Sequence, residues 1–143
     1  MAEMKYDYPA PYSVRVTVKH KDIDMLGHAN NAVYLRWLER AAWSHSKALG
    51  VGWDVFQQLQ RAMVAHRHEL DYLAPCFEGD ELEVCTWVGE RARVGFNRHY
   101  QILRVKDGLT VMRALTRWVC INLETGRPAK MPGEFIAAYQ PRG

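Results

Sequence analysis

The sequence predicts a single α+β domain over residues 1–143, in which one long helix packs on an antiparallel sheet. A chain of 143 residues, 48% of them hydrophobic, has the size of one domain and enough apolar material for a core. One strong helical pattern follows a first strand pattern, and four further strand patterns come after it. Strands joined by short turns pair antiparallel, because parallel pairing needs a longer crossover.

The first two predicted elements differ in their hydrophobic period. In residues 12–19, Val14, Val16 and Val18 alternate with polar side chains, which predicts a strand with one buried face. Residues 32–49 predict a helix, because polar and apolar side chains repeat at helical spacing on opposite faces. The polar stripe contains Arg36, Arg40, Ser44 and Lys47, and the apolar face contains Tyr34, Leu35, Leu38, Ala41, Ala42 and Leu49.

Two residues interrupt this helical pattern. His45 lies on the apolar face, and we interpret it as a core histidine. Trp43 lies within the polar stripe, where an exposed aromatic side chain indicates a packing interface rather than a site. We therefore expect Trp43 to contact a second subunit.

The second half of the chain consists mainly of predicted strands, with short helices expected at residues 53–60 and 133–140. The four strand patterns are residues 63–73, 81–91, 94–105 and 109–123. The second of them alternates Leu82, Val84 and Thr86 against Glu81, Glu83 and Cys85. A Lys-Asp-Gly turn signal separates the last two strands.

Charge and composition argue against several classes of function. The net charge of the protein is +3. Its basic residues are spread along the chain and do not form the stripe that is typical of nucleic-acid binding. No apolar run approaches the length of a membrane span, and the chain begins without an apolar signal core. Cys76, Cys85 and Cys120 form no metal-ligand pattern. We expect free thiols, no bound metal and a cytoplasmic location.

The residues ahead of the long helix carry an unusual set of functional groups. Asp24, Gly27, His28, Asn30 and Asn31 lie close together in the sequence. A glycine turn and one asparagine would suffice for a simple helix cap. The unpaired N–H groups of a helix start can also bind an oxyanion, and a nearby carboxylate can attack a carbonyl group or activate water. This arrangement suits acyl transfer to water.

This stretch resembles the signature of the hotdog-fold acyl-CoA thioesterases, in the branch of the 4-hydroxybenzoyl-CoA thioesterases. The signature is D-x-x-G-H-x-N-N-x-x-Y followed by a carboxylate on the helix. Its positions are filled by Asp24, Gly27, His28, Asn30, Asn31, Tyr34 and Glu39. Residues 70–84 resemble the family's P-x-x-x-G-D turn. The resemblance implies a five-stranded antiparallel sheet wrapped around one long central helix, with active sites between the subunits of a homodimer or homotetramer.

The resemblance also implies roles for single residues. Asp24 matches the catalytic carboxylate, acting as nucleophile or as general base, and the backbone N–H at about Asn31 matches the oxyanion donor. Asp22 is the alternative carboxylate. It lies two residues before Asp24, so in an extended segment both side chains would point to the same side. The substrate would be a thioester of coenzyme A, or of acyl carrier protein, with no separate cofactor.

The remaining signature residues have two readings each. His28 is expected to bond Asp24 or line the pocket, or else to be a structural loop residue. Asn30 is expected to cap the helix, or else to hold the loop, and Tyr34 to pack in the core or contact substrate. Glu39 is assigned a supporting role, and its alternative is a solvated carboxylate or an ion-pair partner of Arg36 or Arg40.

Arginines near a strand turn are candidates for binding the phosphates of coenzyme A. Guanidinium groups suit phosphate oxygens, so we expect this role for Arg91, Arg93 and Arg98. The alternative is that the three are solvated strand-end charges. Arg127 and Lys130 are weaker candidates of the same kind.

We therefore expect an enzyme, an acyl-CoA thioesterase whose acyl group the sequence does not specify. One alternative is a hotdog-fold hydratase or dehydratase acting on acyl thioesters. The G-D-x-N-P-x-H stretch typical of such enzymes is missing from the sequence. A second alternative is a non-catalytic acyl-binding module, against which the intact Asp24 argues.

Overall fold

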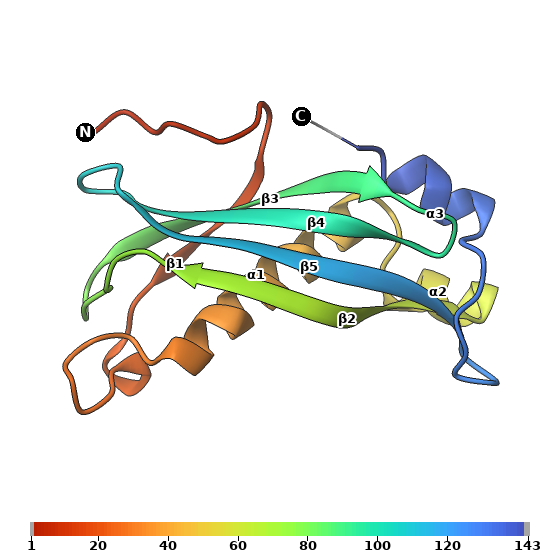
Figure 1. The fold of residues 1–143 in the computed structure, drawn as a ribbon, viewed down its shortest axis with the longest axis horizontal. Coiled ribbons are helices and arrows are strands. Elements are labelled where there is room, and N and C mark those ends of the chain that lie inside the picture. Colours follow the sequence, from red (N-terminus) through yellow and green to blue (C-terminus); the bar gives the residue numbers. More distant parts are fainter. Residues whose placement is uncertain (1, 142–143) are drawn as a thin grey trace.

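The computed structural model describes residues 2–141 of the chain. The predicted order of one strand, a long helix and four further strands is confirmed, as are the two short helices (Figure 1). The elements are β1 (Tyr12–Thr17), the 3₁₀ helix η1 (His20–Asp22), α1 (Asn31–Ala48), α2 (Trp53–Leu59), β2 (Arg61–Tyr72), β3 (Glu81–Arg91), β4 (Gly95–Arg104), β5 (Thr110–Asn122) and α3 (Gly133–Ala138).

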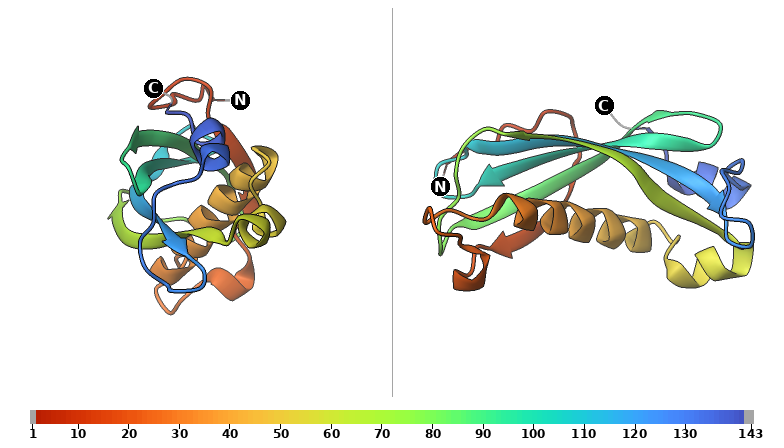
Figure 2. Two further views of the ribbon diagram at one scale, coloured as in Figure 1. Left: turned by 90° about the vertical axis from the view of Figure 1, so that its right-hand side faces the viewer. Right: turned by 60° about the horizontal axis from the view of Figure 1, so that its bottom comes forward.

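The five strands form one antiparallel sheet in the order β1-β3-β4-β5-β2. This order leaves β1 and β2 at the two edges. The β2–β5 register shifts between Ala65 and Arg67, which marks an irregularity in the edge strand β2. The sheet curves over α1, which runs along one of its faces (Figure 2).

Helix α1 packs on the sheet through the face that the sequence pattern predicts. Leu38 and Ala41 are fully buried, and the small side chain of Ala41 lets the helix lie close to the strands. His45 is also buried, which confirms its assignment to the core. The polar-stripe residues Arg36, Arg40 and Lys47 are exposed. No helix of residues 2–141 is long and apolar enough to cross a membrane.

The opposite face of the sheet is covered by the N-terminal segment, which the sequence pattern did not predict. Cys85 and Trp87 point away from α1 but are buried, because Met4 and Tyr8 pack against them. The indole N–H of Trp87 donates to the carbonyl oxygen of Pro9 at 3.0 Å. The expected polar face of β3 is therefore a second, smaller core in its central part.

The two ends of α1 have different surroundings (Figure 1). Helices α2 and α3 lie together near its C-terminal end, and the loop of residues 18–30 lies at its start. This separation places the predicted catalytic motif at one end of the molecule.

Asn30 caps α1, as predicted. Its backbone is extended, with φ −62° and ψ 137°, and its Oδ1 atom accepts a hydrogen bond from the Ala32 N–H at 2.9 Å. An N-cap of this kind satisfies one of the backbone donors that a helix start leaves unpaired. The cap fixes where the helix begins and therefore where its remaining free N–H groups lie.

Replacing Asn30 by alanine should lower the free energy of unfolding by about 1 kcal/mol, because the Ala32 N–H loses its acceptor. Asn30→Asp is the matched control, since a carboxylate oxygen can accept the same hydrogen bond at the positive end of the helix. Urea unfolding at one protein concentration measures both variants. Equal destabilisation by the two substitutions would show that the cap does not act through this acceptor.

Candidate active site

The predicted catalytic motif forms a tight loop that leads into α1. The Asp24 N–H donates to the His28 carbonyl oxygen at 2.9 Å, and the Gly27 N–H donates to the Asp24 carbonyl oxygen at 3.1 Å. Gly27 has a φ of +79°, which glycine adopts without the strain that a side chain would bring. Residues Ile23 and Ala29 form a bridge that closes the loop.

Two further backbone hydrogen bonds fix this loop to the rest of the molecule. The Asn30 N–H donates to the Asp22 carbonyl oxygen, and the Ala29 N–H donates to the Cys76 carbonyl oxygen, both at 2.8 Å. Cys76 belongs to the connection between β2 and β3, in the P-x-x-x-G-D turn that the sequence identified. The start of α1 is thus held from two sides by the main chain.

The two candidate carboxylates have different environments. Asp22 is 8% exposed, and its Oδ2 atom accepts the Lys19 N–H at 2.9 Å, so its carboxylate is used within the η1 turn. Asp24 is half-buried, and its Oδ1 atom accepts the Leu26 N–H at 2.9 Å. The residues that the structure describes make no hydrogen bond to the second oxygen of Asp24. That oxygen is available to a substrate or a water molecule.

The first turn of α1 keeps its positive end uncompensated. It contains no acidic residue, although acidic residues are favoured at this position in helices. Within residues 2–141 the backbone N–H of Asn31 has no hydrogen-bond acceptor. An unpaired donor at a helix start can bind an anion or a developing oxyanion.

This end of the helix borders a hollow of about 260 Å³. His28, Asn31 and Tyr34 line it from the motif, and residues 72–75 line it from the end of β2. The hydroxyl of Tyr72 donates to the Asn31 carbonyl oxygen at 2.9 Å, which ties the two sides together. Sequence reasoning missed the 72–75 wall, because only the folded sheet brings it to the helix start.

Two other signature residues, Tyr34 and His28, line the hollow. Tyr34 is 2% exposed, and burial together with the neighbouring Cys76 side chain raises the pKa of its phenol. It therefore packs in the core and also lines the hollow. The ring of His28 packs edge-on against Phe77 at 5.3 Å, and no hydrogen bond joins it to Asp24 in the described chain.

Glu39 lies outside this hollow. It is exposed on α1, about two turns beyond the helix start, and it does not line the space near Asn31. No ion pair joins it to Arg36 or Arg40 among the described residues. The solvated reading of this carboxylate fits its position within one chain.

The three arginines proposed for phosphate binding do not form one cluster. Arg91 and Arg93 are exposed at the β3–β4 turn, and Arg91 Nη1 donates to the Ile136 carbonyl oxygen at 2.9 Å. This turn lies at the α3 end of the molecule, far from the start of α1 (Figure 1). Arg98 does not fit the expectation, because its side chain is 1% exposed and lies inside the core. The weaker candidates, Arg127 and Lys130, are both exposed.

A basic groove lies between β1 and α1, on the other side of the helix start. It has a volume of about 390 Å³. Its basic lining residues are Arg15, Lys19, Lys21, Arg36 and Arg40. The polar stripe of the helix was a sequence signal for two of them, but their meeting with β1 depends on the fold.

Comparison with known proteins places this chain in a family. Residues 18–139 match the family model of the thioesterase-like superfamily. The chain is 27% identical over 124 residues to the long-chain acyl-CoA thioesterase FadM of Escherichia coli. This match covers 85% of this chain and 91% of that protein. It is also 38% identical over 56 residues to the chloroplastic acyl-[acyl-carrier-protein] hydrolase FATB3 of Cuphea viscosissima, a match that covers 39% of this chain and spans only 14% of the plant protein.

The fold has solved counterparts. The crystal structure of Slr0204, a 1,4-dihydroxy-2-naphthoyl-CoA thioesterase from Synechocystis, superposes with a TM-score of 0.82 at 21% sequence identity and covers 91% of this chain and 96% of that chain. This likeness confirms the hotdog fold of one antiparallel sheet around a central helix. The family match over residues 18–139 shows that the chain belongs to the thioesterase-like superfamily.

Proposed function

We propose that the protein is an acyl-CoA thioesterase, which hydrolyses an acyl-CoA thioester to a free acid and coenzyme A. The observation that carries this proposal is the unpaired backbone N–H of Asn31 at the positive end of α1, next to the Asp24 loop, in a residue that lines a hollow. Membership of the thioesterase-like superfamily supports the reaction class. The matched proteins include thioesterases that act on acyl-CoA and on acyl carrier protein.

In the proposed reaction, the thioester carbonyl oxygen accepts a hydrogen bond from the Asn31 N–H. The helix end stabilises the negative charge that builds up on this oxygen during the attack. Asp24 acts either as the nucleophile or as the general base that takes a proton from the attacking water. In the base route, the oxygen of water bonds to the acyl carbon, the carbon–sulfur bond breaks, and the coenzyme A thiolate leaves and takes up the proton that Asp24 received. In the nucleophile route, an Asp24 oxygen bonds to the acyl carbon as the carbon–sulfur bond breaks, and water then hydrolyses this mixed anhydride, which releases the acid and restores Asp24.

We also propose that the active unit is a homodimer formed through the free edge of β2. This strand is exposed over much of its length, and Val64 and Tyr72 leave apolar surface at the edge. An open edge strand is a template for pairing with another chain. Two chains that pair their β2 strands antiparallel about a twofold axis place the α3 end of each beside the α1 start of the other.

This arrangement gives Arg91 and Arg93 a place in substrate binding. Within one chain they lie at the end opposite to Asn31, but the twofold axis would bring them toward the hollow of the other chain. Both are exposed, so their free guanidinium nitrogens can reach the phosphates of coenzyme A. The basic groove next to α1 is a second surface suited to an anionic carrier, coenzyme A or acyl carrier protein.

The proposed activity predicts thiol release from acyl-CoA and its loss in an Asp24 variant. A panel of short, long and aromatic acyl-CoAs is incubated with the protein, and free thiol is followed with a disulfide reagent. Cys76, Cys85 and Cys120 are buried, so the folded protein contributes little to the signal. Asp24→Asn should lower kcat by about 100-fold or more, because the amide can act neither as nucleophile nor as base.

Two matched variants separate catalysis from folding. Asp22→Ala should lower the melting temperature, because the Lys19 N–H loses its acceptor, whereas Asp24→Asn should leave it nearly unchanged, because the amide oxygen can still accept the Leu26 N–H. Glu39→Gln should keep near-normal kcat. If Asp24→Asn kept near-normal kcat and Glu39→Gln lost activity, the catalytic carboxylate would be Glu39 rather than Asp24. If no acyl-CoA of the panel released thiol and the protein instead added water to an enoyl-CoA, the proposed hydrolase activity would be wrong and a hydratase activity would take its place.

The dimer proposal predicts a sedimenting particle of two 16.5 kDa chains. Val64→Asp places a charge on the β2 edge and should shift the particle toward monomer, with a parallel loss of thiol release. Leu109→Asp is the control, because Leu109 is comparably exposed but lies at the β4–β5 turn. A wild-type protein that is fully active as a monomer would contradict the proposal.

A further inference from the structure

The core contains a positive charge that lies away from the candidate active site. Arg98, on β4, is 1% exposed. Its Nη1 atom donates to the Nδ1 atom of His45 at 2.8 Å and to the Thr86 hydroxyl at 3.0 Å. The Nε and Nη2 atoms are buried and have no hydrogen-bond partner within the described chain. One of the three guanidinium nitrogens is thus satisfied, and the other two are not.

The groups around Arg98 do not balance its charge. A guanidinium group stays protonated in proteins, although burial lowers the pKa of Arg98. Its neighbours Tyr100 and Tyr139 are neutral phenols near pH 7, since burial raises the pKa of both. His45 accepts at Nδ1, so that nitrogen carries no proton in this hydrogen bond and the ring brings no negative charge.

No carboxylate of residues 2–141 forms an ion pair with Arg98. The face of Phe96 lies 5.6 Å from the guanidinium carbon, and this cation–π contact compensates only part of a desolvated charge. A buried charge that has neither a counter-charge nor solvent around it is strongly unfavourable. The structure therefore calls for a counter-charge at this place.

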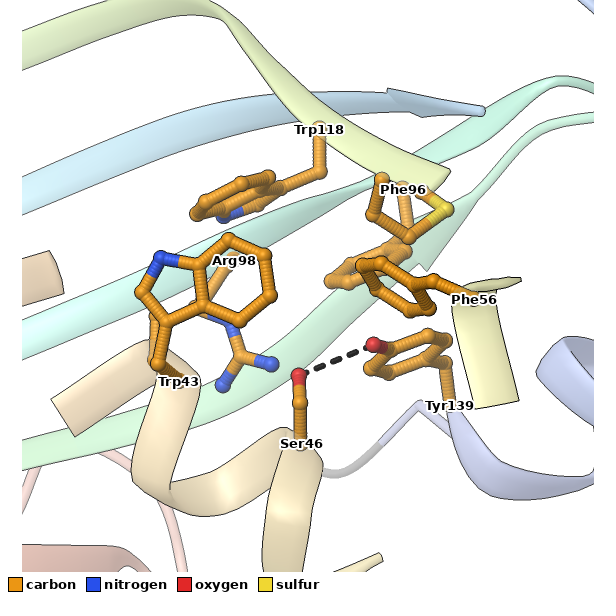
Figure 3. A pocket seen from close by; sticks show the side chains of 9 residues that line it. Trp43, Ser46, Phe56, Phe96, Arg98, Trp118 and Tyr139 are labelled. Carbon is orange, nitrogen blue, oxygen red and sulfur yellow. Dashed lines mark hydrogen bonds between the residues drawn. The ribbon is translucent and has the colours of Figure 1, made fainter. Parts of the chain in front are cut away.

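A small pocket lies beside the guanidinium group of Arg98, which is one of its lining residues (Figure 3). Aromatic side chains form its walls, and Arg98 and Ser46 supply polar groups. The walls are Trp43, Phe56, Phe96, Trp118 and Tyr139. The pocket has a volume of about 10 Å³, which is room for one water molecule or one small ion. Trp43, 40% exposed, lies at the solvent side of the pocket.

The pocket offers mainly hydrogen-bond donors. Ser46 and Tyr139 share one hydrogen bond of 2.8 Å between their hydroxyl oxygens. Whichever hydroxyl donates, the other keeps its own O–H for a further partner. Together with Nε and Nη2 of Arg98, three donor atoms without a full set of partners lie at the pocket, beside one unbalanced positive charge. A water molecule would satisfy donors but would leave the charge unbalanced.

We propose that this pocket binds a small monovalent anion of the size of chloride, held by Arg98 and by the Ser46–Tyr139 hydroxyl pair. A volume of about 10 Å³ suits a monatomic ion better than the three heavy atoms of a carboxylate group. Within one chain the site is separate from the candidate active site, because Ser46 lies about 20 Å from Asn31 along the axis of α1. The anion neutralises Arg98 and links α1, β4 and the segment after α3, and therefore stabilises the folded chain.

Thermal unfolding in matched salts tests the proposal. Wild-type protein is compared in about 0.2 M sodium chloride and in sodium gluconate of equal ionic strength, so that general screening is the same. A ligand that binds only the folded state raises the melting temperature, here by about 3 °C or more. Arg98→Met should abolish the difference between the salts. Arg117→Met, which removes an exposed arginine of β5, should retain it.

A second measurement needs only the wild-type protein and decides the case if Arg98→Met fails to fold. Crystals grown in sodium bromide should show an anomalous peak in the pocket within contact distance of Arg98 Nε and Nη2. Water density at that position, with no anomalous signal, would overturn the proposal. Equal melting temperatures of the wild-type protein in chloride and gluconate, or an undiminished chloride effect in Arg98→Met, would overturn it as well.

Discussion

The start of α1 is held by two backbone hydrogen bonds, and the geometry of the candidate site depends on them. Asn30 donates to Asp22 and Ala29 donates to Cys76, so the segment after β1 and the connection between β2 and β3 meet at one helix end. Because both contacts use main-chain atoms, the position of the next N–H, that of Asn31, is fixed before any ligand arrives. Donors oriented in advance need no reorganisation when charge develops on a substrate oxygen.

The sequence predicts the motif well because its chemistry is contiguous. The turn at Gly27, the cap at Asn30 and the open helix start at Asn31 follow each other within one loop, and local geometry brings them together. The helical period likewise places Leu38 and His45 on the buried face of α1. These features depend on neighbours along the chain, which a single sequence displays.

Features that depend on distant segments were not predictable in the same way. Tyr72 reaches Asn31 only after β2 has paired with β5, and Trp87 is buried only because residues of the N-terminal segment cross the sheet. Arg98 stands between polar residues in the sequence, where an exposed position is the natural expectation. The alternation of side chains along β4 directs Arg98 toward α1. The neighbouring residues in the sequence do not indicate that His45 is its hydrogen-bond partner there.

Helix α1 deals with charge in opposite ways at its two ends. Its first turn lacks acidic residues, so the partial positive charge remains available to a substrate, with Asp24 supplied from the preceding loop. Its last turn contains His45, which accepts from Arg98, and the negative end of the helix favours a cation nearby. That interaction contributes only about 0.3–1 kcal/mol for one charge. Burial of an unpaired ion costs several times as much, so the helix alone does not stabilise Arg98, and the pocket beside it needs a negative charge.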